Sequence, residues 1–209
     1  VINYSPGAVG IDRETRIAHI RALKPHMAAL NMGSMNYAIY SSQKKRFYHD
    51  HIFENKFEDI RFYLEAMNEA VTIPEMECFD LGHINNVTPL RDLGLVPTNA
   101  CYSLVMGVLG GIPASTQNLV HMVGCLPAGA SWQVIGIGKV QWPLVAAAVT
   151  LGGNIRVGLE DNFYLRPGEM ARSNADLVSK AARMVQDIGG DLASPAEVRE
   201  RLGLASVPV

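Results

Sequence analysis

The segment Asn154–Asn162 combines side chains whose types and spacing could carry out chemistry. Read as a strand, it places Arg156, Gly158 and Glu160 on one face and apolar residues on the other, because successive side chains alternate. Burying a charged pair on a strand is costly, so the pair marks either a functional site or a structural ion pair. Asp161 follows at the C-terminal end of this strand, where α/β folds place their reactive groups.

Two more carboxylates, Glu75 and Glu77, share one face of another predicted strand. Arginine is always protonated and can hold a carboxylate through two parallel hydrogen bonds. A carboxylate beside it can act as a base when its surroundings tune its pKa. The set therefore suits acid–base chemistry, although a salt bridge explains Arg156 and Glu160 equally well. Glu75 is interpreted as a member of an ion pair.

Strand-like and helical segments alternate along the chain and must position these residues. The predicted strands are residues 1–4, 27–31, 75–79, 102–108, 131–137 and 154–159. The predicted helices are residues 12–23, 57–69, 84–93, 115–123, 143–150, 171–188 and 195–202. Ser194 and Glu197 form a capping box that starts the last helix, and a proline follows Ser194 at the first helical position.

This alternation predicts a parallel sheet with helices outside it. A complete (β/α)₈ barrel takes about 250 residues, so 209 residues give either an open sheet of six strands or a barrel that lacks two units. Both faces of an open sheet would be buried, leaving no wet surface for the charged strand residues. We therefore predict an α/β fold in which residues 1–209 form a single domain, the C-terminal part of a TIM barrel with about six of its eight βα units.

The composition narrows the functional classes. A net charge of −2 gives no reason to expect a nucleic acid or an anionic membrane as partner. The sequence has no apolar run of membrane-spanning length. Cys78, Cys101 and Cys125 are odd in number and widely spaced, which favours a reducing compartment, and we predict a cytoplasmic protein. Cys78 and Cys101 lie in apolar strands and are expected to be inert core residues.

Several segments together resemble the β-keto acid cleavage enzymes, and the resemblance covers essentially the whole chain. The matching segments are Gly7–Gly10, Lys24–Pro25, Leu30–Gly33, Pro74–Glu77, Gly107–Gly111, Gly136–Gly138, Arg156–Asn162, Ser173–Val178 and Arg199–Leu204. The resemblance implies a zinc-dependent TIM barrel that carries out a retro-Claisen exchange, in which a β-keto acid and acetyl-CoA give acetoacetate and a new acyl-CoA. It also implies a homo-oligomer, often a tetramer, whose partners are a small β-keto acid and a CoA ester.

The resemblance assigns roles to four charged residues. Glu160 matches the carboxylate that binds Zn²⁺, although another divalent metal could replace zinc. Arg156 and Asp161 match the polar pair that deprotonates the substrate and stabilises the resulting charge. Glu77 matches a carboxylate that lines the same pocket. A Lewis-acidic metal with an open coordination position would polarise the keto oxygen.

Further residues are candidates for substrate binding. Ser5 and Gly7 fall where the family has a substrate-orienting turn. Ala29 stands at a position that carries a hydroxyl group elsewhere in the family, and Asn31 and Ser34 nearby could compensate.

The glycine-rich segment that contains Gly110 and Gly111 permits two interpretations. It could cradle a phosphate of CoA at the mouth of the barrel, where such sites recur. A tight turn that needs glycine conformations explains it equally well.

The chain departs from the family pattern in its metal ligands. The paired histidines of a His-x-His motif lie on the second barrel strand, which is missing here with the first, so we expect a further N-terminal segment. His49 and His51 have the right spacing but lie in a polar insertion, residues 41–54, interpreted as an exposed loop. His83 could face the pocket or cap a loop. The alternative functions are another divalent-metal carbon–carbon lyase of aldolase type and a non-catalytic barrel fragment.

Overall fold

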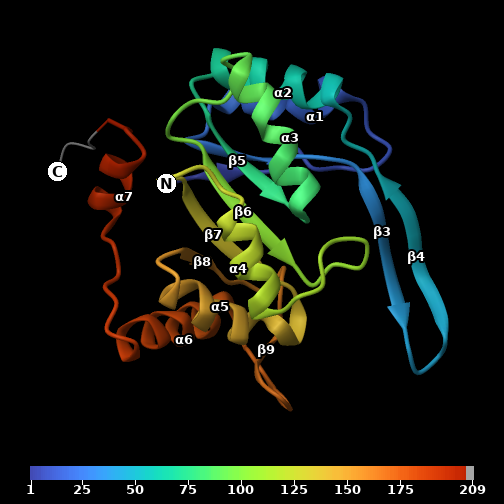
Figure 1. The fold of residues 1–209 in the computed structure, drawn as a ribbon, viewed down its shortest axis with the longest axis vertical. Helices are drawn as coiled ribbons and strands as arrows, with labels where there is room; N and C mark the ends of the chain where they lie inside the picture. The colour runs from blue at the N-terminus through green and yellow to red at the C-terminus, as the bar shows by residue number, and fades with distance from the viewer. Residues whose placement is uncertain (206–209) are drawn as a thin grey trace.

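The computed structural model describes residues 1–205 and shows one sheet of six parallel strands, curled into a half-barrel (Figure 1). The strand order is β1-β2-β5-β6-β7-β8. The strands are β1 (Asn3–Tyr4), β2 (Met27–Asn31), β5 (Ile73–Cys78), β6 (Cys101–Met106), β7 (Ser131–Gly136) and β8 (Asn154–Arg156). The predicted parallel sheet of a partial TIM barrel is confirmed.

Helices cover the outer face of this sheet in two groups (Figure 1). The helices are α1 (Arg13–Leu23), α2 (Phe57–Glu69), α3 (Leu81–Asp92), α4 (Thr116–Gly124), the 3₁₀ turn η1 (Gly138–Val140), α5 (Gln141–Thr150), α6 (Asn174–Asp187) and α7 (Pro195–Arg201). Asp12, Asp80 and Ser115 start α1, α3 and α4, because their side-chain oxygens accept hydrogen bonds from backbone N–H groups that the helix leaves free. The predicted capping box at Ser194 is present.

The period of two along each strand separates core from site. In β5, Met76 and Cys78 point outward into the main hydrophobic core under the helices, and both are fully buried. Glu75 and Glu77 alternate with them and point to the concave side, where they line a cavity. Burial of each large apolar side chain contributes about 1.5–3 kcal/mol, so the outer core fixes the direction in which the two carboxylates point.

The segment predicted as an exposed insertion forms an antiparallel hairpin instead. Its strands are β3 (Met35–Ser41) and β4 (Arg46–Phe53), with Tyr37 opposite His51. The hairpin stands beside the parallel sheet and extends away from it (Figure 1). Side chains alternate along it, and those near its base turn toward the cavity, including Tyr37, His51 and Phe53.

The sixth parallel strand is shorter than predicted. It ends at Arg156, and backbone N–H groups of Asp161 and Asn162 bond to the carbonyl of Gly158 at 3.1 and 3.0 Å. Glu160 therefore lies on a turn and not on the same strand face as Arg156. Two short strands that the sequence pattern does not predict follow, β9 (Tyr164–Arg166) and β10 (Glu169–Met170).

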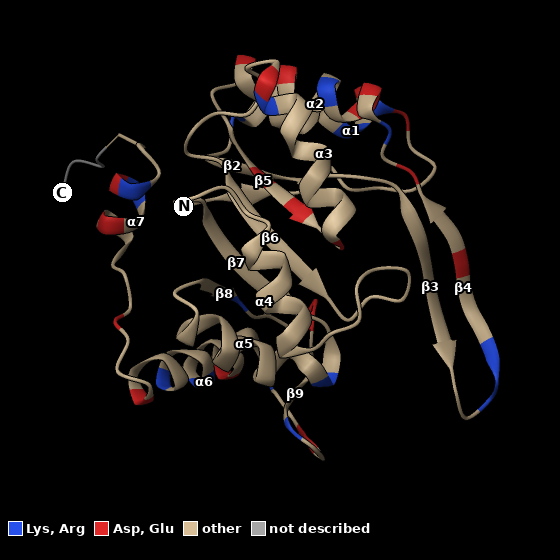
Figure 2. Cartoon of the chain, in the orientation of Figure 1, with Lys and Arg blue, Asp and Glu red and all other residues tan. Residues whose placement is uncertain are grey.

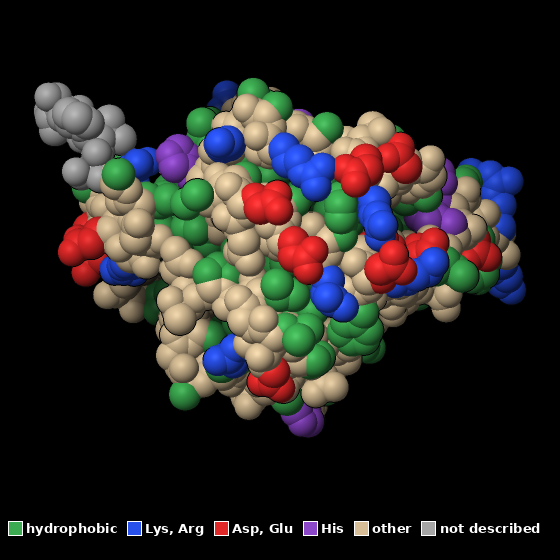
Figure 3. Space-filling model, turned by 90° about the horizontal axis from the view of Figure 1, so that it is seen from above, with side chains coloured by type: hydrophobic (Ala, Val, Ile, Leu, Met, Phe, Trp, Pro, Cys, Tyr) green, Lys and Arg blue, Asp and Glu red, His purple; other side chains and the backbone are tan. Residues whose placement is uncertain are grey.

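Charged side chains lie mainly on the helices and the hairpin (Figure 2). On the face seen in Figure 3, acidic and basic side chains are interspersed, with apolar patches between them. Cys78 and Cys101 are buried, as predicted, and Cys125 is exposed. Among residues 1–205, we find no helix with the length and apolar character needed to cross a membrane.

Candidate active site

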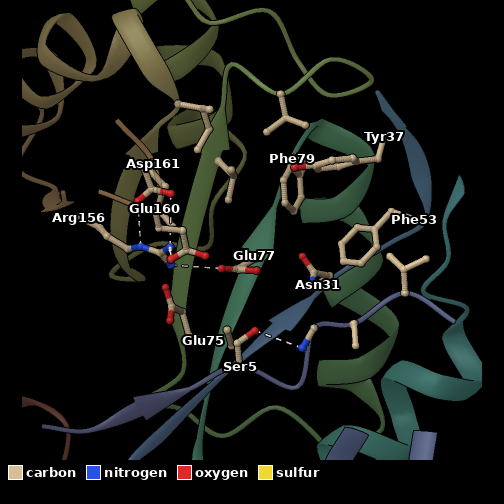
Figure 4. Close-up of a pocket in the computed structure, with 18 of the residues that line it drawn as sticks. Ser5, Asn31, Tyr37, Phe53, Glu75, Glu77, Phe79, Arg156, Glu160 and Asp161 are labelled. Atoms are coloured by element: carbon tan, nitrogen blue, oxygen red, sulfur yellow. Dashed lines mark hydrogen bonds and ion pairs between the residues drawn. The ribbon is translucent and has the colours of Figure 1, made fainter. Parts of the chain in front are cut away.

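A cavity of about 720 Å³ lies on the concave side of the sheet, between the strand ends and the hairpin (Figure 4). Seven of the residues predicted from the sequence line it: Ser5, Gly7, Asn31, Glu77, Arg156, Glu160 and Asp161. They come from segments far apart in the chain. The curl of the sheet brings these segments together, because parallel strands present their carboxyl ends at the same edge.

Arg156 contacts three carboxylates at the end of β8. Its Nη2 lies 2.8 Å from Glu160 Oε2, its Nε lies 3.3 Å from Asp161 Oδ2, and its Nη1 lies 3.5 Å from Glu77 Oε1. The turn that ends β8 makes this geometry possible, since it folds Glu160 and Asp161 back over the strand. Asp161 is buried, whereas the side chain of Glu160 is 81% exposed.

The electrostatics favour a protonated Glu77. Burial raises the pKa of Glu77 to about 7, and the neighbouring Glu75 adds to the effect, while Arg156 opposes it. Burial also raises the pKa of Asp161, and its close contact with Arg156 counteracts part of that rise. A carboxyl group with a pKa near 7 can both donate and accept a proton at neutral pH.

Glu75 lies deeper than Glu77 and is fully buried. The sequence predicts an ion pair for it, and that prediction is wrong: its carboxylate accepts hydrogen bonds from three neutral side chains, Asn3, Ser103 and Gln133. The Gln133 bond is 2.7 Å long. These donors satisfy the buried carboxylate without a cation. The sequence pattern did not identify these three side chains as partners of Glu75, although the alternation of side chains along each strand places them on its inward face.

The predicted substrate-binding residues at the bottom of the cavity lie around Asn31. Asn31 is buried, and its Oδ1 has no hydrogen-bond partner among the described residues. Ser5 and Gly7 lie across from it, with the Gly7 N–H donating to Ser5 Oγ at 3.2 Å. A buried, unpaired amide oxygen at a cavity wall is costly unless a ligand or water completes it.

Three predicted substrate-binding residues lie outside the cavity lining. Ser34 Oγ accepts a hydrogen bond from the backbone N–H of Asn55 at 2.7 Å and ties the base of the hairpin to the start of α2. Gly110 has a φ of 106°, and a Cβ there would lie 1.8 Å from the carbonyl oxygen of Asn36. A Cβ on Gly111 would lie 2.7 Å from the carbonyl oxygen of Phe79. Both glycines thus allow close backbone packing against the hairpin and the end of β5.

The histidines take different positions. His51 lines the cavity from β4. His83 is buried in the first turn of α3, where its Nδ1 accepts a hydrogen bond from the Phe79 N–H at 3.4 Å, and burial lowers its pKa. It does not line the cavity. Tyr37 and Phe53 of the hairpin add apolar surface to the cavity, and the sequence pattern had not indicated this contribution.

The donor set for a metal is incomplete in residues 1–205. No group of three or more His, Cys, Asp and Glu side chains in this part of the chain is arranged to hold a metal ion. Glu160 lines the cavity, but its carboxylate forms an ion pair with Arg156. Zinc sites need three or four ligands. The described residues therefore supply one ligand of the implied site and not the whole site.

Comparison with known proteins gives a consistent result. The model of a family described as "beta-keto acid cleavage enzyme" matches residues 1–204. The chain is 37% identical to the 3-keto-5-aminohexanoate cleavage enzyme of Acetoanaerobium sticklandii, over 95% of this chain and 69% of that protein. It is 34% identical to the 3,5-dioxohexanoate:acetyl-CoA acetone transferase of Paraburkholderia graminis, over 98% of this chain and 72% of that protein.

Solved structures support the fold. The ternary complex of ObcA with a C4-CoA adduct and oxalate superposes with a TM-score of 0.79 at 21% identity. The match covers 97% of this chain and 52% of the ObcA chain. This chain thus spans about half the length of that structure.

Proposed function

Because the chain belongs to the β-keto acid cleavage enzyme family, we propose that it catalyses the exchange of a β-keto acid with acetyl-CoA to give acetoacetate and a new acyl-CoA. The observation that carries this proposal is the cluster around Arg156, where Glu77 has a pKa of about 7. The names of similar proteins include acetyl-CoA as co-substrate, which supports a CoA ester as the second substrate here.

In the proposed mechanism, Asp161 removes the proton between the two carbonyl groups of the keto acid. Arg156 stabilises the enolate, since a fixed guanidinium beside the developing charge needs no reorganisation. The enolate carbon then attacks the acetyl-CoA thioester and expels the CoA thiolate. Asp161 is suited to the first step because its partner Arg156 lies 3.3 Å away and holds its carboxylate in place.

The CoA thiolate next attacks the original keto carbon, and the carbon–carbon bond breaks. The acyl group leaves on CoA, and the remaining acetoacetate enolate needs a proton. We assign this proton to Glu77, on the other side of the guanidinium, since an acid with a pKa of about 7 is half protonated at neutral pH. The proton taken by Asp161 then restores Glu77, so the cycle balances.

We further propose that Glu160 binds Zn²⁺ or another divalent metal, together with donors that residues 1–205 do not supply in this arrangement. When bound, such a metal would polarise the keto oxygen. Metal analysis of the wild type beside Glu160→Gln tests this directly. Metal that remains undiminished in the variant would remove Glu160 from the ligand set. The homo-oligomer, often a tetramer, that the resemblance implies stays a proposal, and so does the cytoplasmic location inferred from the cysteines.

The decisive assay follows acetyl-CoA consumption with a panel of β-keto acids. We expect acetoacetate and a new acyl-CoA in equal amounts from the wild type, and a loss of about 10²–10⁴-fold in Glu77→Gln. Glu65→Gln, on the exposed side of α2, is the matched control. Cleavage without acetyl-CoA would favour the aldolase-type lyase, and no turnover of any keto acid would favour a non-catalytic barrel fragment.

A further inference from the structure

The cavity has two chemically different halves (Figure 4). Arg156, Glu160 and Asp161 gather on one side, whereas Tyr37, Phe53 and Phe79 lie on the other. We call the second side the apolar wall. Its lining residues are Tyr37, Phe53, Phe79, Val105 and Val108. Ile135 pairs in register with Arg156 and so joins this wall to the polar side.

The apolar wall belongs to a hydrophobic cluster separate from the main core. Its four buried members are Met35, Phe79, Val105 and Ile135, and Tyr37, Phe53, Val108 and Ile137 pack on them half-buried. No helix covers this cluster among the described residues, because it lies on the concave side of the sheet. Its exposed face is the cavity wall itself, and apolar surface of this kind gains free energy when a ligand removes it from water.

The acidic side chains and the arginine that line the cavity lie on the polar side, whereas His51 packs against Tyr37 of the apolar wall, with ring centroids 5.2 Å apart. Asn31 lies between the two halves, and its buried Oδ1, which has no partner among the described residues, can accept a hydrogen bond from a ligand hydroxyl group or from a water molecule at this border. The cavity is therefore shaped for a molecule with a polar head at Arg156, a polar atom near Asn31 and an apolar end beyond it.

We propose that the variable end of the β-keto acid, the acyl group that leaves on CoA, is uncharged and apolar and lies on the apolar wall. This inference rests on the proposed function and specifies its substrate class. A second carboxylate or an ammonium group packed against Phe79 and Val108 would lose water there, and no Asp, Glu, Lys or Arg side chain of the described residues lies on this wall.

Binding of unreactive analogues tests the inference without turnover. The ligands are 3-hydroxy acids of equal length that end in an alkyl, an ammonium or a carboxylate group, measured by isothermal titration calorimetry. We expect the alkyl analogue to bind at least about tenfold more tightly than either charged one, the size of effect that one or two methylenes give in an apolar pocket. Equal or tighter binding of a charged analogue, or no binding of the alkyl one, would overturn the proposal.

Variants locate the effect on the wall. Val108→Asp is expected to lose at least about tenfold in affinity for the alkyl analogue, because it places a carboxylate on the apolar wall. Val120→Asp, an equally drastic change on the outer face of α4, should keep the wild-type affinity. Circular dichroism checks that Val108→Asp folds. Val108→Thr, which keeps the shape of the valine side chain, should also lower the affinity for the alkyl analogue, by a smaller factor. An unchanged affinity in both Val108 variants would contradict the assignment.

These outcomes separate the two proposals. If the alkyl analogue binds with the expected preference but no keto acid is turned over with acetyl-CoA, the reaction assignment fails and the ligand class stands. If charged keto acids are turned over best, the reaction stands and the ligand class fails.

Discussion

At the scale of single residues, the site depends on how one guanidinium is shared. Arg156 contacts Glu77, Glu160 and Asp161, and its closest contact is with Glu160, the most exposed of the three. The weakest contact, at 3.5 Å, is with Glu77, so burial dominates the pKa of this carboxyl group. The geometry thus divides the three carboxylates into two, Glu160 and Asp161, that pair closely with Arg156, and one, Glu77, whose pKa is about 7.

This division predicts a bell-shaped dependence of kcat/KM on pH. The reaction needs Asp161 ionised, so activity falls at acidic pH, below the raised pKa of that group. It also needs Glu77 protonated, so activity falls as the pH rises above about 7. Rate measurements across this range should show that Glu77→Gln loses the alkaline fall and keeps the acidic one. An alkaline fall that persists in the variant would assign that proton to another group.

The same pKa predicts how stability changes with pH. The pKa of Glu77 is raised in the folded state to about 7 from 4.5, so the folded protein holds a proton that the unfolded chain releases. Stability from this group is complete below pH 4.5 and is lost as the pH rises through about 7. Glu77→Gln should therefore be more stable than the wild type at pH 8, by about 1–3 kcal/mol, and no more stable at pH 4.

Urea unfolding at the two pH values measures this difference, with Glu65→Gln as the control. Glu65 is about half exposed on α2 and pairs only loosely with Arg61, at 3.9 Å, so its replacement should change stability little at either pH. A Glu77→Gln variant that is destabilised at pH 8 would show that the ionised carboxylate contributes more through Arg156 than burial costs.

The sequence was informative for charged residues and less so for neutral ones. Arg156, Glu77 and Asp161 could be predicted because buried charges on apolar strands are rare and expensive. Asn3 and Gln133, which bind Glu75, could not, since neutral polar residues occur on strands for many reasons. The pKa of Glu77 was also out of reach, because it depends on burial in three dimensions.

At the scale of elements, the hairpin β3–β4 is the feature that sequence reasoning identified incorrectly. Its turn, residues 42–45, lacks the Asn-Gly or Asp-Gly pair that marks a short hairpin. Its polar composition resembled that of a loop, although the structure pairs Tyr37 with His51 and Met35 with Phe53 across the two strands. The buried central strands of the half-barrel were predicted because each has an apolar pattern on its outer face, whereas the end of β8 was predicted three residues too late.

The hairpin is held against the body by a close backbone approach at Gly110. Gly110→Ala should destabilise the protein by about 2–4 kcal/mol, because the new Cβ would overlap the Asn36 carbonyl oxygen and φ is 106°. Urea unfolding gives the comparison with Gly124→Ala, where a Cβ meets no atom within 4 Å and the expected change is small. Equal stabilities for the two variants would mean that the hairpin shifts freely and does not form a fixed wall of the cavity.

At the scale of the whole molecule, the curled sheet has two ends. β1 and β8 are the first and last strands in the sheet order, so each has one side without a strand partner among residues 1–205. Unpaired backbone groups on a strand invite pairing with another chain. Ile2, just before β1, is 52% exposed and adds apolar surface at the same end. The open shape could be predicted from chain length and the number of βα units, whereas the exposure of this end required the structure.

For a chain of residues 1–209 alone, the unpaired side of β1 predicts self-association through that edge of the sheet. Light scattering should give a mass above the 22.7 kDa of one chain, and the mass should rise with concentration. Ile2→Lys should lower it, because a charged side chain beside an unpaired strand opposes pairing with a second chain. Leu192→Lys, equally exposed at 52% but outside the sheet, serves as the control and should behave as the wild type. A mass of one chain at every concentration would rule out this association. An oligomer that Ile2→Lys leaves intact would place the contact elsewhere. The exposed apolar side chains of the hairpin, such as Phe47, would then be the next surface to change.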